Sequence, residues 1–184
     1  MIYTIFEYKP DNFYPFSINH ATFEVRAGAF SILDRIEHKM DSDDQIILIV
    51  RDAIEELVSE RYPHLTVNPD IIPPSKLFCL DKEVGEIKEE TSLSNFRTKD
   101  WINIEESYLW NHLGSVAFSY DKQRFNMKVQ GDCHSSCIML NKADIHISES
   151  AIVSAGVILD ATDGPIIIDD DATKDRWRLC YWNW

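Results

Sequence analysis

Apolar residues recur at every sixth position near the C-terminal end of the chain. Ile147, Val153 and Leu159 form this series, and Ala151 and Val157 follow its first two members by four residues. Small or polar residues fill most of the positions between them. A period of six fits neither the helical period of about 3.6 nor a simple alternation. It is typical of a parallel β-helix, in which each six-residue unit supplies one short strand and one corner.

Three such units close one turn of about 18 residues. With a short bulge at residues 163–165, the pattern predicts that Ile168 stacks on Ile147 and that Ala172 takes the small-residue position. The alternative is an antiparallel meander that turns at the same bulge. Residues 166–168 form a strand in either case.

The N-terminal part of the chain alternates between strand-like and helix-like patterns. Strands are predicted at residues 1–6, 45–50 and 66–68, and amphipathic helices at residues 24–40 and 52–62. The run at 45–50 is continuously apolar, which is typical of a central parallel strand. Strands that alternate with helices in this way predict an open α/β sheet.

The middle of the chain is less regular. Residues 76–80 are predicted as a further strand that ends in a turn at Asp81. Residues 83–97 are charged and are expected to form a surface excursion or a weak helix. Residues 101–113 read as an aromatic-rich connector, and residues 120–129 as a helix followed by a strand.

These patterns divide the chain into three parts. Residues 1–128 are predicted as an α/β domain with a linker, residues 129–173 as the start of the β-helix, and residues 174–184 as a basic, aromatic tail. A stack that stops after one turn exposes its stacking surface. The tail is therefore the product of a truncated or frameshifted gene, a cap on the open turn, or a subunit interface.

Composition narrows the classes of function. The chain has 184 residues, of which 45% are hydrophobic, and a formal net charge of −13 at pH 7. The hydrophobic share is enough for a core, and the negative charge, with no basic stripe to offset it, argues against nucleic acid as a partner. No apolar run approaches the roughly 20 residues of a membrane span, and the N-terminus is unlike a signal peptide. Four cysteines without a disulfide-like spacing predict a cytoplasmic, reduced protein.

Several short motifs resemble one family. Residues 15–17 read Pro-Phe-Ser, and Glu24, Val25, Arg26 and Gly28 follow them. This order is similar to the opening P-L-T-x-T-R-P-x-x-E-L-R-x-G of a bacterial subgroup of the sugar nucleotidyltransferases. The subgroup itself resembles the bifunctional N-acetylglucosamine-1-phosphate uridylyltransferase.

The resemblance extends over most of residues 1–173, with departures. At positions 20–21, His and Ala replace the Arg and Pro of the subgroup. Residues 50–51 resemble its V-R-x-x-L step, and residues 110–111 its Trp-Asp step. Residues 153–168 are the most specific part and are very similar to the start of its left-handed β-helix.

The resemblance implies a fold and an activity. The fold is a Rossmann-like, nucleotidyltransferase-type open sheet followed by the first coil of a left-handed parallel β-helix. The activity is nucleotidyl transfer from an NTP to a sugar phosphate, with Mg²⁺ as cofactor. Complete members trimerise through the β-helix and often transfer an acyl group with a histidine as general base, for which His134 and His146 are the local candidates.

Nucleotidyl transfer requires a Gly-rich loop around the triphosphate, a cation on the leaving pyrophosphate and carboxylates for Mg²⁺. The loop falls on residues 7–12, which contain no glycine, and Asn12 takes the place of the usual Arg. Lys9 and Arg26 are candidate phosphate contacts, with a plain surface position and a helix-surface ion pair as the alternatives. Asp81 is the candidate Mg²⁺ ligand, with a turn residue as the alternative.

The resemblance assigns roles to seven positions. Arg26 is the candidate catalytic residue, and Asp81 the candidate metal ligand. The candidate substrate-binding residues are Lys9, Asn12, Glu24, Gly28 and Arg51. Asp52 either lies at the carboxyl end of a strand, where open α/β sites are found, or caps a helix. The missing glycines favour a second hypothesis, a non-catalytic module that binds a sugar nucleotide or serves assembly.

One further cluster suggests a metal. Cys133, His134 and Cys137 lie close together in the sequence and could be zinc ligands. A C-x₃-C spacing with one flanking histidine and no second pair is poor geometry for tetrahedral zinc. A purely structural role for these residues is the preferred interpretation.

Overall fold

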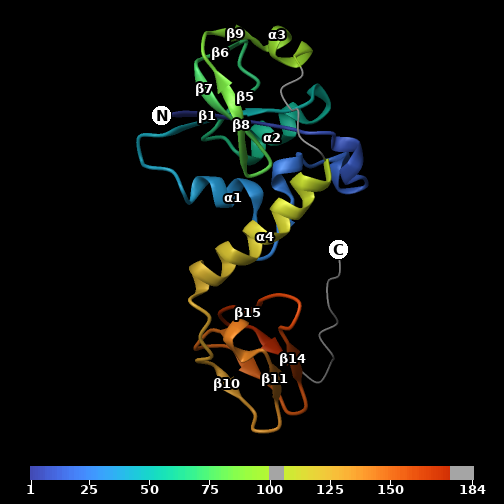
Figure 1. Cartoon of the computed structure of the whole chain (residues 1–184), viewed down its shortest axis with the longest axis vertical. Helices are drawn as coiled ribbons and strands as arrows, with labels where there is room; N and C mark the ends of the chain where they lie inside the picture. The colour runs from blue at the N-terminus through green and yellow to red at the C-terminus, as the bar shows by residue number, and fades with distance from the viewer. Residues whose placement is uncertain (100–105, 175–184) are drawn as a thin grey trace. The chain divides into compact units, whose positions relative to one another are not determined.

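The computed structural model describes residues 1–99 and 106–174 of a mixed α/β chain (Figure 1). The chain divides into two compact units, residues 1–114 and residues 115–184. The division falls inside helix α4 (Glu106–Phe125), which has 20 residues. The predicted connector and the helix predicted after it are therefore largely one helix. The tail residues 175–184 lie outside the described residues.

The first unit is built on a five-stranded sheet with the order β5–β4–β1–β7–β8. Its strands are β1 (Ile2–Phe6), β4 (Gln45–Ile49), β5 (Thr66–Val67), β7 (Ser75–Cys79) and β8 (Lys82–Ile87). The first four are parallel to one another, and β8 is an antiparallel edge strand. The strand order reverses at β1, because β4 and β5 lie on one side of it and β7 and β8 on the other.

The four parallel strands confirm the strands predicted from apolar runs. In β4, residues 46–49 are all buried, as expected for a central strand. The edge strand β8 is a correction, because residues 83–97 were expected to form a surface excursion or a weak helix. Its charged residues suit an exposed edge, where charge discourages pairing with other chains, and they conceal the strand in the sequence.

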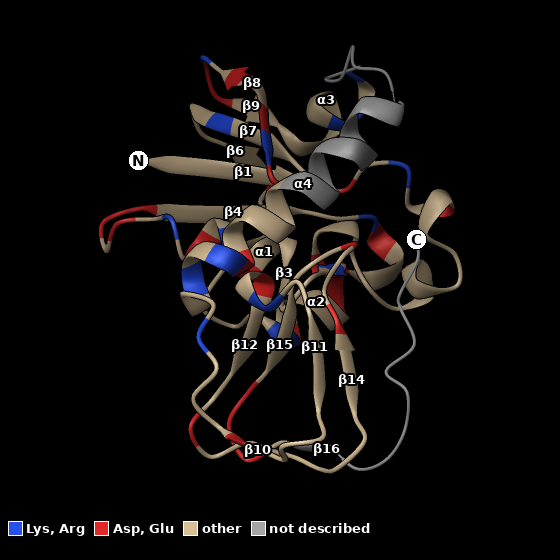
Figure 2. Cartoon of the chain, turned by 60° about the horizontal axis from the view of Figure 1, so that its bottom comes forward, with Lys and Arg blue, Asp and Glu red and all other residues tan. Residues whose placement is uncertain are grey.

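Three short helices accompany the sheet. They are α1 (Ile32–Glu37), α2 (Glu55–Arg61), which follows the 3₁₀ turn η4 (Asp52–Ile54), and α3 (Leu93–Thr98). A small antiparallel pair, β6 (Ile71–Ile72) with β9 (Thr91–Ser92), precedes α3. In both views α1 lies on one side of β1, and α3 on the other (Figures 1 and 2).

The predicted helix from Glu24 is wrong over its first part. After the 3₁₀ turn η3 (Thr22–Glu24), the chain forms a hairpin of β2 (Arg26–Ala27) and β3 (Phe30–Ser31). Gly28 turns this hairpin at a φ of 81°, which glycine adopts without the steric cost that a Cβ imposes. Helix α1 then begins after Ser31, whose Oγ accepts a hydrogen bond of 3.0 Å from the backbone N–H of Asp34.

The second unit consists of short parallel strands in three ladders. One turn of chain contains β10 (Asp132–Cys133), β11 (Ile138–Leu140) and β12 (Ile145–Ile147), with the 3₁₀ turn η5 (Lys142–Asp144) between the last two. The next turn contains β13 (Ile152–Val153), β14 (Ile158–Asp160) and β15 (Ile166–Ile168), and β16 (Thr173–Lys174) follows. Each strand of the first turn pairs in parallel with its counterpart in the second, and β13 pairs with β16.

The predicted stacking is confirmed, because Ile168 lies opposite Ile147 in the β12–β15 pair. The three members of the six-residue series are at most 1% exposed, and so are the two residues that follow them by four. The parallel pairing excludes the antiparallel meander. A further turn precedes the one that the six-residue series marks, because the strands at 132–147 form a turn of their own and Val129 bridges to Ile147.

Gly131 allows the first turn to pass close beneath the second. A Cβ at this position would lie 2.5 Å from the carbonyl oxygens of both Ser148 and Ala151. Backbone atoms cannot move aside easily, so only glycine fits here. None of the helices in residues 1–99 and 106–174 combines the length and the apolar character that a membrane span requires.

Candidate functional site

An open cavity of about 400 Å³ lies at the carboxyl ends of β1 and β4. Phe6 and Glu7 border it from the end of β1, residues 49–52 from the end of β4, and Phe96 and Arg97 from α3. Open α/β sheets bind ligands outside the carboxyl ends of their strands, at the point where the strand order reverses. This carboxyl-end cavity adjoins β1, the strand at which the order reverses.

A nearly buried ion pair joins the two strand ends at this cavity. The Arg51 guanidinium donates to one carboxylate oxygen of Glu7 and to the carbonyl oxygen of Ser17. The backbone N–H of Arg51 donates to the other Glu7 oxygen at 2.8 Å. The side chains of Glu7 and Arg51 are 6% and 27% exposed. Burial raises the pKa of Glu7, although its bonds to Arg51 act in the opposite direction.

Two further side chains hold the loop that follows β4. Arg97 donates from α3 to a carboxylate oxygen of Asp52 at 2.6 Å and to the Val50 carbonyl at 2.8 Å. Asn68, which follows β5, accepts from the Val50 N–H at 2.9 Å and donates to the Val50 carbonyl at 3.0 Å. Groups from β1, β5 and α3 thus preorganise one loop at the rim of the cavity.

The cavity combines an apolar wall with both signs of charge. The rings of Phe6 and Phe96 pack edge to face, with centroids 5.6 Å apart. Asp52 lies at the carboxyl end of β4, the first of its two expected positions, and its side chain is 79% exposed. Such a site can hold a flat apolar ring, accept hydrogen bonds from hydroxyl groups at Asp52, and offer the Arg97 guanidinium to an anion.

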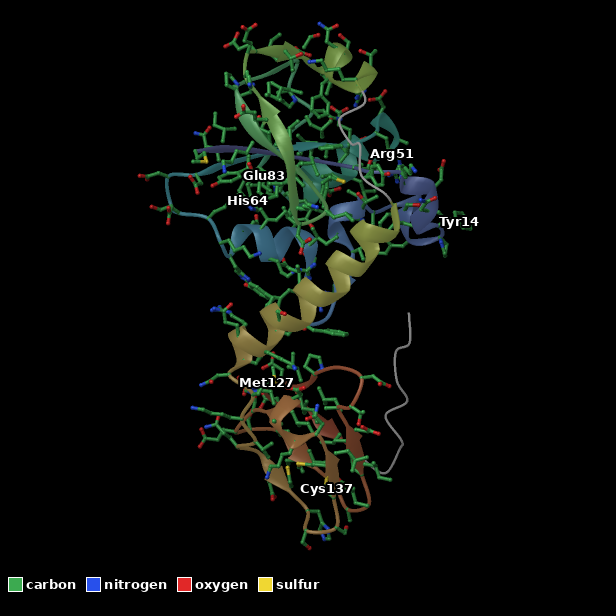
Figure 3. All side chains as sticks on the ribbon, viewed as in Figure 1. Tyr14, Arg51, His64, Glu83, Met127 and Cys137 are labelled. Atoms are coloured by element: carbon green, nitrogen blue, oxygen red, sulfur yellow. The ribbon has the colours of Figure 1, made fainter. Side chains whose placement is uncertain are left out.

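Of the predicted substrate-binding residues, Arg51 lines this cavity. Lys9 and Asn12 lie next to it, on either side of the cavity residue Pro10, in and just before the 3₁₀ turn η1 (Pro10–Phe13). Both side chains are exposed, and the Lys9 ammonium lies 5.3 Å from the centre of the Tyr8 ring. Figure 3 shows the side chain of Arg51 in the first unit.

Glu24 has a structural environment. Its carboxylate is buried and accepts hydrogen bonds from the backbone of Ala21 at 2.5 Å, from Arg61 at 3.0 Å and from the Tyr62 hydroxyl at 3.3 Å. Burial, together with the nearby charge of Glu24, raises the pKa of Tyr62. These bonds tie the turn before β2 to the end of α2, and they occupy the carboxylate that was predicted to bind substrate.

Arg26 and Gly28 lie in the β2–β3 hairpin. Arg26 is exposed and stands opposite Ser31, so the helix-surface ion pair that was its alternative role has no helix to support it. Neither residue is among those that line the carboxyl-end cavity in the described parts of the chain. The catalytic role of Arg26 stays a prediction from the resemblance.

Asp81 forms a fully buried ion pair with Arg35 of α1, in which Nε and Oδ2 are 3.5 Å apart. The Arg35 guanidinium also donates to the carbonyl oxygens of Ala27 and Phe30 at 2.9 and 3.1 Å. This arrangement explains why Asp81 follows β7 without facing the solvent. Within residues 1–99 and 106–174, no group of three or more His, Cys, Asp or Glu side chains is arranged to hold a metal ion.

The histidines of the second unit have separate surroundings. His134 is exposed, and its Nδ1 lies 2.8 Å from the Ser136 hydroxyl. His146 is buried, with Nε2 3.2 Å from the Ser148 hydroxyl and its ring 5.1 Å from that of Phe125. The zinc interpretation therefore lacks its histidine, because His134 faces outward while Cys133 packs on the core.

Sequence reasoning missed the roles of Glu7 and Arg97. Glu7 was considered only as part of the glycine-free loop at residues 7–12, and Arg97 ended the charged stretch at 83–97. The chain matches no protein-family model, and no curated protein or solved structure matches it.

Proposed function

We propose that the first unit binds a nucleotide or a sugar nucleotide in the carboxyl-end cavity and does not transfer it. The observation that carries this proposal is the Glu7–Arg51 pair. A carboxylate stands where a nucleotidyltransferase presents glycine N–H groups to the triphosphate, which disfavours transfer, while its partner Arg51 keeps a cation at the cavity for an anionic ligand.

The order of the parallel strands supports the choice of ligand. The order β5–β4–β1–β7 supports the proposal, because doubly wound, Rossmann-like sheets have this strand order and place nucleotides at the carboxyl ends of their strands. In such sheets an acidic residue after the second strand accepts hydrogen bonds from ribose hydroxyls. Asp52 follows β4, which is the second strand of this sheet along the chain, and Asp52 takes that role in the proposal.

The basic residues around the cavity are the proposed contacts for phosphate. Arg97 lines the cavity, with one terminal nitrogen on the Asp52 carboxylate and the other on the Val50 carbonyl, and its side chain is 34% exposed. Arg51 is held by Glu7, so a phosphate gains its guanidinium only when it competes with that carboxylate. The proposed ligand therefore carries a small anionic group that competes with Asp52 for Arg97 and with Glu7 for Arg51.

For the second unit we propose that the stacked parallel turns are the start of a left-handed β-helix that assembles the protein into a homo-oligomer, with a trimer expected from the resemblance. The strands of two successive turns pair in the same order, β10 with β13, β11 with β14 and β12 with β15, and this repetition supports the assignment. Nucleotidyl transfer with Mg²⁺ remains the competing function that the resemblance suggests.

A thermal-shift experiment tests the binding proposal. UTP and a panel of UDP-sugars are added at millimolar concentration, with and without Mg²⁺. We expect at least one of them to raise the melting temperature, and the rise to persist without Mg²⁺. Release of pyrophosphate from UTP with a sugar 1-phosphate would overturn the non-catalytic proposal in favour of transfer, and no stabilisation by any ligand would overturn binding itself.

A further inference from the structure

Three sulfur-containing side chains occupy consecutive inward positions of the first stacked turn. Cys133 pairs with Val153, and Met139 pairs with Leu159. Cys137 lies beneath Val157, because the next residue, Ile138, donates its N–H to the Val157 carbonyl at 3.0 Å. Where the second turn has Val, Val and Leu, the first turn therefore has Cys, Cys and Met.

The sulfur residues are also the accessible members of this core. Val153, Val157 and Leu159 are at most 1% exposed. Cys133, Cys137 and Met139 are only half-buried, although they pack on the same core. In the described part of the chain, no further strand pairs beneath β10 or β11, so these side chains lie at the open end of the stack.

The two cysteines lie four residues apart, on either side of one tight turn. The backbone N–H of Cys137 donates to the carbonyl of His134 at 2.9 Å, which closes a tight turn between the two cysteines. Burial raises the pKa of both thiols, and a negative charge on Cys133 raises the pKa of Cys137 further. Besides burial, the Asp132 carboxylate raises the pKa of Cys133, and the Lys142 ammonium lowers it. Figure 3 shows Cys137 on the stacked turns.

Packing does not require sulfur at these positions, because aliphatic side chains fill the same places one turn later. Two thiols and a thioether are the ligands that soft metal ions such as Cu(I) prefer. Zinc, in contrast, favours four ligands, and His134 is turned outward to Ser136.

We propose that Cys133 and Cys137, with Met139 as a third and weaker ligand, bind one Cu(I) ion at the open end of the stacked turns. Each thiol loses its proton to the solvent as its sulfur binds the metal. Two thiolates and one Cu(I) ion leave a single negative charge on the site. No electron is transferred in this step.

The test is a Cu(I) titration of the full, reduced chain without oxygen, against the chromophoric chelator bicinchoninate. The decisive variant is C133V/C137V, which copies the side chains of the second turn and should therefore fold. We expect one tightly bound Cu(I) per wild-type chain, none in C133V/C137V, and weaker binding in Met139→Leu. His134→Ala and Cys180→Ser serve as controls and are expected to bind as the wild type does.

Several results would overturn the site. They are Cu(I) binding that survives in C133V/C137V, loss of binding in Cys180→Ser, and Zn²⁺ binding by the same residues as tight as that of Cu(I). If C133V/C137V does not fold, alkylation of the wild-type chain followed by mass spectrometry decides the question. Protection of Cys133 and Cys137 by Cu(I) supports the site, and unchanged alkylation of both refutes it.

Discussion

Ile147 and Ile168 lie opposite each other in the parallel pair β12–β15, and their side chains are 0% and 2% exposed. They are 21 residues apart in the sequence, so one full turn of chain separates two residues that stack directly on one another. This relationship makes the second unit a stack whose stability depends on its inward-facing positions.

Removing one inward side chain should therefore destabilise the stack far more than removing its outward neighbour. Leu159→Ala empties a fully buried position and is expected to cost about 2–5 kcal/mol. Ile158→Ala, one residue away and 40% exposed, should cost less than about 1 kcal/mol. Hydrogen exchange of peptides from residues 129–174 measures the loss of stability in both variants. Equal effects would show that the two side chains do not face opposite ways.

Gly131 should not tolerate a side chain. Gly131→Ala places a methyl group 2.5 Å from two carbonyl oxygens and is expected to destabilise the second unit by about 1–3 kcal/mol. Gly85→Ala in β8 is the matched control, because a Cβ there meets nothing within 4 Å. Thermal unfolding of the two variants gives the comparison, and a harmless Gly131→Ala would contradict the close approach of the first two turns.

The buried pair of Arg35 and Asp81 allows a test of whether Asp81 is a structural residue or a metal ligand. Asp81→Ala leaves a fully buried guanidinium without its carboxylate and is expected to cost about 3–5 kcal/mol. Glu83→Gln breaks the exposed pair with Lys76 and should cost at most about 1 kcal/mol. Urea unfolding measures the two changes. Unchanged stability in Asp81→Ala with a loss of Mg²⁺-dependent nucleotide binding would support the metal-ligand prediction instead.

Nucleotide binding should strengthen as the pH falls from neutral to mildly acidic values. Burial raises the pKa of Glu7 above its ordinary value of 4.5, so its carboxylate takes up a proton at a higher pH than an exposed glutamate. Protonation removes a negative charge from the cavity and loosens the hold of Glu7 on Arg51, and both changes favour an anionic ligand. Calorimetric titrations at several pH values should show the trend in the wild type and not in Glu7→Gln.

The raised pKa of Glu7 also makes the stability of the first unit depend on pH. A carboxyl group whose pKa is higher in the folded than in the unfolded state stabilises the fold below its unfolded pKa. That contribution is lost as the pH rises through the folded value. The exposed Glu56→Gln variant is the control, and its free energy of unfolding should vary with pH as that of the wild type does. If the free energy of unfolding of Glu7→Gln also varied with pH as in the wild type, the assignment to Glu7 would be contradicted.

The parts of the fold that follow from local patterning could be predicted from the sequence. The run at 45–50 is buried on both faces, and the six-residue series reports which side chains face inward. Residues 129–146 fall in the range predicted for the β-helix, but the six-residue spacing of Cys133, Met139 and Ile145 was not recognised, because sulfur residues with polar neighbours weaken the apolar signal. The hairpin at 26–31 was missed because apolar spacing alone does not register a glycine turn.

The candidate site was predictable only in part. Arg51 and Asp52 follow a recognisable strand, and the carboxyl end of such a strand is a favoured place for a ligand. Glu7 and Arg97 both contact the loop that follows β4, but they lie 90 residues apart in the sequence. No local sequence pattern links residues so far apart. Their contacts depend on the pairing of β1 with β4 and on the position of α3, which only the folded chain defines.

The proposed function is tested most directly by titration calorimetry of the sugar nucleotide that gives the largest thermal shift, with two arginine variants. If the carboxyl-end cavity is the site, Arg97→Gln should weaken binding by about tenfold or more, as expected for the loss of one charged phosphate contact. Arg26→Gln, on the hairpin, should bind as the wild type does. Loss of binding in Arg26→Gln with normal binding in Arg97→Gln would contradict the account and restore the site that the family resemblance implies.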